Sequence, residues 1–261
     1  MHPLLHIATE AAREAGKTIV RAFDRLDTVS VSEKKQNDLV TEIDKLAEEQ
    51  IIGFIRKAHP NHSILGEESG EITGNDTCWI IDPLDGTTNF VHGIPHFSIS
   101  IAVKHKNKYQ VGVIFDPIRQ EMFMVTAGEG ARLNDHKIRV KQNNKLITAL
   151  LGTGFPYREL QNFKPYLKIF ANVVPQCRGL RRMGSAALDL AYVAAGRFDG
   201  FWEFGLKPWD YAAGVLMIQE SGGLVTDLLG GDTYEKTGNI LAATPEIHEQ
   251  LKKIIQPLTA E

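Results

Sequence analysis

One segment constrains this chain more than any other: the apolar run Cys78 to Ile81 leads directly into Asp82-Pro-Leu-Asp85-Gly-Thr-Thr88. The apolar run is typical of a buried strand, and the chain is expected to change from strand to loop at the acids, because Asp, Pro and Gly favour turns. Two carboxylates offer hard oxygens suited to Mg²⁺, and backbone amides at the start of a helix suit phosphate oxygens. Taken alone, the segment is also compatible with an ordinary turn that caps a helix.

Further acids stand beside predicted secondary structure at two other places. Glu67 and Glu68 follow an apolar, strand-like stretch, and Asp210 stands at the start of an apolar helix, where it could also serve as a helix cap. One carboxylate binds Mg²⁺ weakly, whereas several held by separate elements can clamp it. The dispersed acids therefore predict a two-metal site.

Hydrophobic periodicity predicts a layered α/β architecture in which a sheet-rich first half, to about residue 145, precedes an alternating second half. Three successive strand-like runs between residues 97 and 125 indicate an antiparallel meander. The predicted helices are residues 3–24, 41–58, 158–173, 185–195, 209–221 and 245–255. The predicted strands are residues 29–32, 78–81, 97–103, 109–115, 121–125, 148–151, 177–180, 199–203, 224–227 and 239–242.

Composition excludes several classes of protein. The 261 residues are 43% hydrophobic and lack a Pro/Gly/Ser-rich linker, so residues 1–261 are expected to form a single domain. The 29 basic and 32 acidic residues are interspersed, which gives no overall field to attract nucleic acid or an anionic membrane. No segment approaches the roughly 20 apolar residues that span a bilayer, so a cytoplasmic protein is expected.

Two motifs make the sequence resemble the inositol monophosphatase family. They read Trp79-Ile-Ile-Asp-Pro-Leu-Asp-Gly-Thr-Thr-Asn-Phe90 and Trp209-Asp-Tyr-Ala-Ala-Gly214. The resemblance runs end to end, and several stretches, including 181–197, look most like the bacterial SuhB-type branch. It is also carried by Asp38-Leu-Val-Thr-Glu-Ile-Asp44, Gly66-Glu-Glu-Ser69, Gly184-Ser-Ala-Ala-Leu-Asp-Leu190, Glu220-Ser-Gly-Gly223 and Thr237-Gly-Asn239.

The resemblance implies an α/β (α+β) fold, a layered αβαβα sandwich, in a cytoplasmic protein that is usually a homodimer. It implies two or three Mg²⁺ ions per active site and inhibition by lithium. The implied reaction is hydrolysis of inositol monophosphate, or a related polyol phosphate monoester, by direct in-line attack of metal-activated water.

The resemblance also assigns roles to individual residues. The implied metal ligands are Glu67, Asp82, the Leu84 carbonyl, Asp85 and Asp210, with Asp82 bridging two ions and Asp38 and Asp44 acting behind them. Glu67, Thr87 and Asp85 form the implied catalytic set, in which Glu67 withdraws a proton from water directly or through the Thr87 hydroxyl. The implied substrate contacts are Asp85, Gly86, Thr87, Thr88, Arg181, Ser185, Ala186, Glu203 and Asp210.

Two alternatives stay open. The same metal core serves relatives that act on fructose 1,6-bisphosphate, a 3′-phosphoadenosine nucleotide or NADP, although the compact loops around Asp85 and Glu203 favour a monophosphorylated polyol. SuhB-type proteins are also associated with transcription antitermination and ribosome biogenesis, so transcription machinery or RNA polymerase is a possible partner. The cluster Arg178, Arg181 and Arg182 could contribute to such a contact, or could lie in solvent or at a dimer interface.

Overall fold

The computed structural model describes residues 2–35, 38–157 and 160–259. Its helices are α1 (Pro3–Phe23), α2 (Glu42–Ala58), α3 (Thr87–Val91), α4 (Phe163–Val173), α5 (Ala186–Ala194), α6 (Pro208–Glu220), α7 (Tyr234–Thr237) and α8 (Pro245–Thr259). Short 3₁₀ turns occupy Leu26–Thr28, Leu146–Thr148, Leu160–Asn162 and Val174–Gln176.

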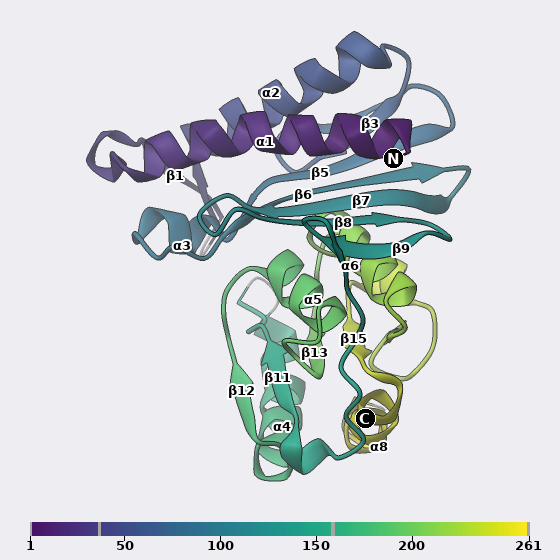
Figure 1. Ribbon diagram of the computed structural model, residues 1–261. Helices are drawn as coiled ribbons and strands as arrows, with labels where there is room; N and C mark the ends of the chain where they lie inside the picture. Colours follow the sequence, from purple (N-terminus) through teal and green to yellow (C-terminus); the bar gives the residue numbers. More distant parts are fainter. Residues whose placement is uncertain (1, 36–37, 158–159, 260–261) are drawn as a thin grey trace.

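A large, mostly antiparallel sheet forms the upper part of the molecule in Figure 1. Its strand order is β10-β9-β8-β7-β6-β5-β3-β4, and only β3 and β5 run parallel to each other. The strands are β3 (Ser63–Gly66), β4 (Gly70–Ile72), β5 (Thr77–Asp85), β6 (Ser98–His105), β7 (Lys108–Asp116), β8 (Glu121–Thr126), β9 (Gly130–Leu133) and β10 (His136–Lys137). The consecutive strands β6, β7 and β8 confirm the predicted meander.

A smaller sheet lies below, with the order β12-β11-β13-β15-β14. A separate two-stranded ribbon joins β1 to β2 near α3. These strands are β1 (Val31–Lys35), β2 (Asp38–Thr41), β11 (Leu150–Thr153), β12 (Gly179–Arg181), β13 (Gly200–Glu203), β14 (Leu224–Thr226) and β15 (Ile240–Ala243).

The helices complete five layers. In Figure 1, α1 and α2 cover one face of the large sheet, α5 and α6 lie between the two sheets, and α4 and α8 cover the outer face of the small sheet. One apolar cluster lies between the large sheet and α1 and α2, a second surrounds α5 and α6 between the two sheets, and a third lies between the small sheet and α4 and α8. The αβαβα sandwich expected from the sequence is therefore confirmed.

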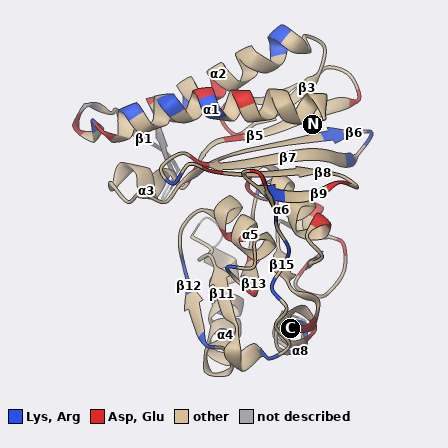
Figure 2. Cartoon of the chain, in the orientation of Figure 1, with Lys and Arg blue, Asp and Glu red and all other residues tan. Residues whose placement is uncertain are grey.

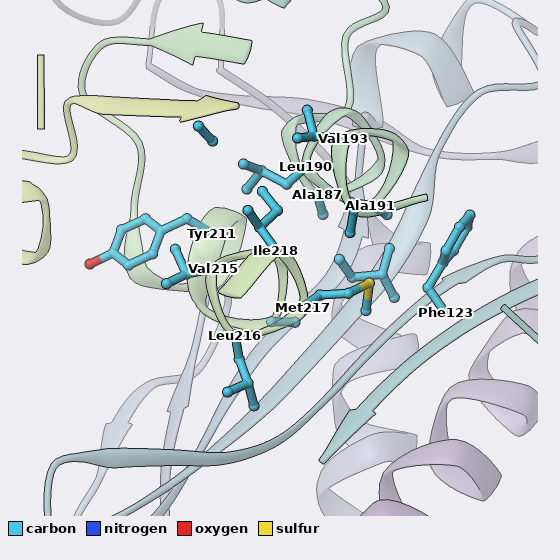
Figure 3. Close-up of a cluster of buried hydrophobic side chains, with 14 of the residues drawn as sticks. Phe123, Ala187, Leu190, Ala191, Val193, Tyr211, Val215, Leu216, Met217 and Ile218 are labelled. Carbon is cyan, nitrogen blue, oxygen red and sulfur yellow. The ribbon is translucent and has the colours of Figure 1, made fainter. Parts of the chain in front are cut away.

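The central layer owes its compactness to two glycines. A Cβ on Gly214 of α6 would lie 2.5 Å from the Cβ of Leu190 on α5, and one on Gly112 of β7 would lie 3.0 Å from the Cα of Ala213. Side chains such as Val193 and Met217 fill the remaining space (Figure 3). This packing holds α5 and α6 against the large sheet. The first turns of both helices therefore have a fixed position relative to that sheet.

Capping residues define the starts of the two outer helices. Pro3 occupies the first turn of α1, where its missing N–H costs nothing. The Thr41 hydroxyl accepts from the N–H of Asp44, whose carboxylate accepts in return from the Thr41 N–H, a capping box that begins α2. The capping residues at the start of α2 therefore fix the position of the Asp44 carboxylate.

Several sequence-based boundaries differ from the structure, and two of the differences concern the strand that carries Asp82 and the helix α4. The strand through Trp79 does not end at Asp82 but continues to Asp85, with a register shift between Asp82 and Asp85 in its pairing with β6. Pro83 has no backbone N–H to donate, which is acceptable where the strand pairing is irregular. Both acids therefore remain on the strand. The helix predicted over 158–173 begins only at Phe163; residues 158–159 lie outside the described ranges.

Among the described residues, no helix is both long enough and apolar enough to cross a membrane. Lys and Arg are interspersed with Asp and Glu along α1 and α2 (Figure 2). These helices show no surface of a single charge sign.

Candidate metal and phosphate site

Parallel pairing of β3 with β5 brings the first acids together. Gly66 at the end of β3 is in register with Ile81 of β5, and the N–H of Glu67 donates to the Ile81 carbonyl at 3.1 Å. Because both strands run in the same direction, Glu67 and Asp82 emerge at the same edge of the sheet. A residue that looked isolated in the sequence is thus adjacent to the main acidic segment.

The alternation of β5 decides which way Asp82 points. Ile80 belongs to the cluster around α5 and α6, whereas Trp79 and Ile81 face α1 and α2. Successive strand side chains point to opposite faces, so Asp82 shares the face of Ile80. That face is covered by α6, whose first turn carries Asp210.

Asp82, Asp85 and Asp210 form a compact acidic cluster. One carboxylate oxygen from each lies within 4.8 Å of the others. Asp82 is 1% exposed, and burial, followed by the charges of Glu67, Asp85 and Asp210, raises its pKa well above the usual range. Like charges at this spacing in a largely buried place are neutralised by protons or by a cation, and an all-oxygen donor set suits a hard cation such as Mg²⁺.

Asp85 ties this cluster to the start of α5. One of its carboxylate oxygens accepts from the Ser185 hydroxyl at 2.5 Å and from the N–H of Ala187 at 2.8 Å. Ser185 also caps α5 by accepting from the N–H of Leu188. Asp85 also offers a carboxylate oxygen to the cluster with Asp82 and Asp210, where it could bind a cation.

The Thr87 hydroxyl lies beside two acceptors, Asp44 Oδ1 at 2.9 Å and the Leu84 carbonyl at 3.0 Å. A hydroxyl has one proton to donate, and a carboxylate is the stronger acceptor. Donation to Asp44 leaves the lone pairs of Thr87 Oγ1 able to accept a proton from a neighbouring water. Asp44 is 1% exposed, and burial raises its pKa although its hydrogen bonds with Thr41 and Thr87 oppose that rise.

Strand β6 holds the two central helices at the site. The Ser100 hydroxyl donates to the carbonyl of Trp209 at 3.1 Å, and the hydroxyls of Ser98 and Ser185 lie 3.3 Å apart. From α3, the side-chain amide of Asn89 donates to the carbonyls of His96 and Met183. The starts of α3, α5 and α6 are therefore held relative to one another.

A cavity of about 590 Å³ opens beside the acids, a volume in the range of small-molecule sites. Eleven of the twelve site residues expected from the sequence line it, while Arg181 does not. Arg181 is exposed on β12, and its neighbour Arg182 lines the cavity instead. The lining residues that were expected are Glu67, Asp82, Leu84, Asp85, Gly86, Thr87, Thr88, Ser185, Ala186, Glu203 and Asp210.

The remaining walls come from residues that the sequence analysis did not select for this role. Arg182 lies over the rings of Phe155 and Tyr157, which also line the cavity. Asp189 lines it from α5. Asp189 and Arg182 stand in stretches that carry the family resemblance, but the resemblance gave them no role in the site, and a run such as Phe155-Pro-Tyr157 is common in loops. The side chain of Asp38, expected behind the metal ligands, lies outside the described part of the structure.

Glu48 is a further residue that sequence reasoning missed. It is 2% exposed on α2, and its carboxylate accepts from the backbone N–H groups of Glu68 at 3.0 Å and Ser69 at 2.6 Å. These bonds fix the turn that carries Glu67. Periodicity placed Glu48 on a helix but could not show that it faces a loop twenty residues later.

We expect Glu48→Gln to raise the Mg²⁺ concentration for half-maximal activity about fivefold, because the two N–H groups bond different oxygens of the carboxylate, an amide has only one, and the loss of about one hydrogen bond costs about 1 kcal/mol. Activity at saturating Mg²⁺ should be largely kept. The exposed neighbour Glu49→Gln is the matched control and should behave as wild type. An unchanged Mg²⁺ dependence in Glu48→Gln would contradict a positioning role.

The metal-free protein should lose stability as the pH rises toward 7. Burial and then the Asp210 charge raise the pKa of Asp85 to about 7, against an ordinary value near 4. Between these values the folded protein holds a proton that the unfolded chain has released. This contribution is complete below about pH 4 and is lost as the pH rises through about 7.

Asp85→Asn removes that titration. In EDTA, the melting temperature of the variant minus that of wild type should therefore increase from pH 5 to pH 7.5, as thermal unfolding by circular dichroism would show. A difference that stays constant across this range would mean that Asp85 ionises normally.

Comparison with known proteins agrees with this geometry. The fold and site define a metal-dependent class of phosphatase, and the inositol monophosphatase family model matches residues 1–260. This chain belongs to the inositol monophosphatase family.

Individual relatives support the same conclusion. The chain is 51% identical to the Nus factor SuhB of Pseudomonas aeruginosa, over 98% of this chain and 97% of that protein. Among solved structures, the extragenic suppressor protein suhB of Bartonella henselae aligns with a TM-score of 0.94 at 43% identity, covering 97% and 98% of the two chains. An inositol monophosphatase from Anabaena aligns with a TM-score of 0.87 at 40% identity, covering 97% and 95%.

Proposed function

We propose that the protein hydrolyses phosphate monoesters of small polyols, with inositol monophosphate as the leading substrate, in a reaction that requires Mg²⁺. The largely buried cluster of Asp82, Asp85 and Asp210 in the lining of the cavity carries the proposal. The family assignment and the Anabaena inositol monophosphatase support the same substrate class.

The donor set fits two or three magnesium ions. Glu67, Asp82, the Leu84 carbonyl, Asp85 and Asp210 would hold them, and Asp82 is the acid whose pKa is raised by the charges of the other three carboxylates. When bound, Mg²⁺ would neutralise the acids, bind phosphate oxygens and activate a water for in-line attack on phosphorus.

The protein's own groups would orient the phosphate and move the proton. Gly86, Thr87 and Thr88 begin α3, where the first N–H groups have no partner within the helix and suit phosphate oxygens. The Thr87 hydroxyl donates a hydrogen bond to Asp44 and would accept the proton of the attacking water. Glu67 would be the second group able to withdraw that proton.

The rest of the cavity would bind the leaving group. Glu203 at the end of β13 would offer a carboxylate to ring hydroxyls, and Ser185 and Ala186 line the same cavity near Asp85. Arg181, which the resemblance implies as a substrate contact, is exposed on β12, whereas Arg182 lines the cavity, and a contact of Arg181 with the substrate stays a prediction.

A substrate panel tests the assignment. Phosphate release from inositol 1-phosphate should exceed that from fructose 1,6-bisphosphate, a 3′-phosphoadenosine nucleotide and NADP by at least tenfold in kcat/KM. A preference for any of the latter three would reassign the substrate while keeping the phosphatase chemistry.

Three further properties of the family are proposed for this chain. We expect a homodimer, cytoplasmic localisation, and inhibition by lithium at millimolar concentration. Light scattering, cell fractionation and a lithium titration would check them in turn, with a monomer, a membrane-bound pool or lithium-resistant activity as the opposing results.

A role in transcription antitermination is the second candidate, because a relative 51% identical carries the name Nus factor. The exposed Arg178 and Arg181 on or beside the edge strand β12 offer a cationic contact to transcription machinery. Binding of RNA polymerase should survive Asp82→Asn and weaken in an Arg178→Glu, Arg181→Glu double variant. Equal loss in both variants, or no binding at all, would argue against this role.

A further inference from the structure

Asp189 is a buried acid in the cavity wall that the reaction described above does not use. It is 1% exposed, lies in the first turn of α5 and lines the cavity. It follows Ser185 by four residues and so lies on the same face of the helix, about 6 Å along the axis. Ser185 contacts Asp85, so Asp189 lies one turn behind the site of chemistry.

Its hydrogen bonding is incomplete. Within the described residues, Asp189 Oδ1 is buried and has no hydrogen-bond partner. The equally buried Asp199 shows the ordinary situation, because it accepts from the Asn143 side chain at 2.9 Å and from the Leu150 N–H at 2.8 Å. A buried polar oxygen without a partner is costly to fold, so its presence in a cavity wall points to a ligand that completes it.

The surroundings define what kind of ligand group fits. After burial, the charges of Glu203 and Asp85 raise the pKa of Asp189 well above the usual range, while Arg182 opposes the rise. A neutral carboxyl can both donate and accept. A hydroxyl has the same dual capacity, whereas a phosphate oxygen would be drawn to the Mg²⁺ and amide side of the cavity instead.

We infer that Asp189 is a specificity-determining residue that hydrogen-bonds a hydroxyl of the leaving group, on the α5 side of the cavity, while Glu203 serves the β13 side. Together the two carboxyls select a leaving group with at least two hydroxyls. The inference rests on the proposed phosphatase function and names the groups that confer its preference for polyols.

The test compares KM for inositol 1-phosphate with the inhibition constant of inorganic phosphate, which has no leaving group. Asp189→Leu should raise KM about tenfold, the effect of losing one hydrogen bond, and leave the phosphate inhibition constant and kcat within about threefold. Asp189→Asn keeps a donor and an acceptor and should retain most of the affinity. Asp199→Asn, remote from the cavity, should leave both constants unchanged.

Each possible result supports or contradicts the role of Asp189. Parallel changes in KM and the phosphate inhibition constant, or a wild-type KM in Asp189→Leu, would overturn the inference while the phosphatase function stands. No phosphate release by wild-type protein from inositol 1-phosphate or glycerol 2-phosphate would overturn both. Melting temperatures of all variants separate misfolding from altered binding, and Asp189→Ala, which also removes both carboxyl oxygens, carries the same expectation should Asp189→Leu fail to fold.

Discussion

Asp82→Asn is expected to lower Mg²⁺-dependent phosphate release at least about 10³-fold, because Asp82 lies among the other metal-binding carboxylates and a lost ligand charge removes several kcal/mol of transition-state stabilisation. The same variant should be at least as stable as wild type in EDTA. Its buried carboxylate is repelled by Glu67, Asp85 and Asp210, and an amide removes that repulsion. Mg²⁺ should then raise the melting temperature of wild type and not of the variant.

Asp227→Asn provides the matched control with the opposite pattern. Asp227 is also buried, but its carboxylate accepts from Leu229, Gly231 and Thr233 within a turn outside the cavity. We expect this variant to lose stability and keep its activity per folded molecule. An Asp82→Asn protein that retained Mg²⁺-dependent turnover would remove Asp82 from the metal site.

Thr87→Val is expected to lower kcat about 10²-fold with little change in KM, since general acid–base groups contribute roughly 10² to 10⁴ in rate. Valine keeps the shape of threonine but cannot pass a proton toward Asp44, whose Oδ1 lies 2.9 Å from the Thr87 hydroxyl. Steady-state kinetics with inositol 1-phosphate would measure the loss.

Thr87→Ser separates chemistry from packing, because serine retains the hydroxyl and should keep activity within about tenfold of wild type. If the serine and valine variants were equally impaired, the methyl group rather than the hydroxyl would be the important feature. If neither were impaired, Glu67 alone would have to accept the proton.

The acids of the site could be identified from the sequence because motifs carry them. Asp82 and Asp85 stand in one segment, Glu67 and Asp210 stand beside a predicted strand and helix, and the resemblance to the family assigned all four as metal ligands. Periodicity also located the long helices and the meander, since their apolar faces repeat at 3.6 or 2 residues. The acidic motifs and the periodic helices and strands could be predicted because each lies within a short continuous stretch of the sequence.

The supporting residues could not be read in the same way, because their partners are distant in sequence. Glu48 bonds a loop that follows 20 residues later, and Ser100 bonds the carbonyl of Trp209. Asp189 stands on an apolar helix that, by pattern alone, is only a core element. Arg182 rather than Arg181 lines the cavity. Which of the two does so depends on the path of the chain at the end of the short edge strand β12, and the sequence pattern does not predict that path. The expectation of a single domain over residues 1–261 stays a prediction.

The most direct measurement is phosphate release from inositol 1-phosphate by the purified wild-type protein, first stripped of metal with EDTA and then titrated with Mg²⁺. We expect no release without metal and saturable recovery as Mg²⁺ is added. Undiminished release from the stripped, folded protein would contradict the assignment of the acidic cluster as a catalytic metal site, and no release at saturating Mg²⁺ would contradict inositol monophosphate as the substrate.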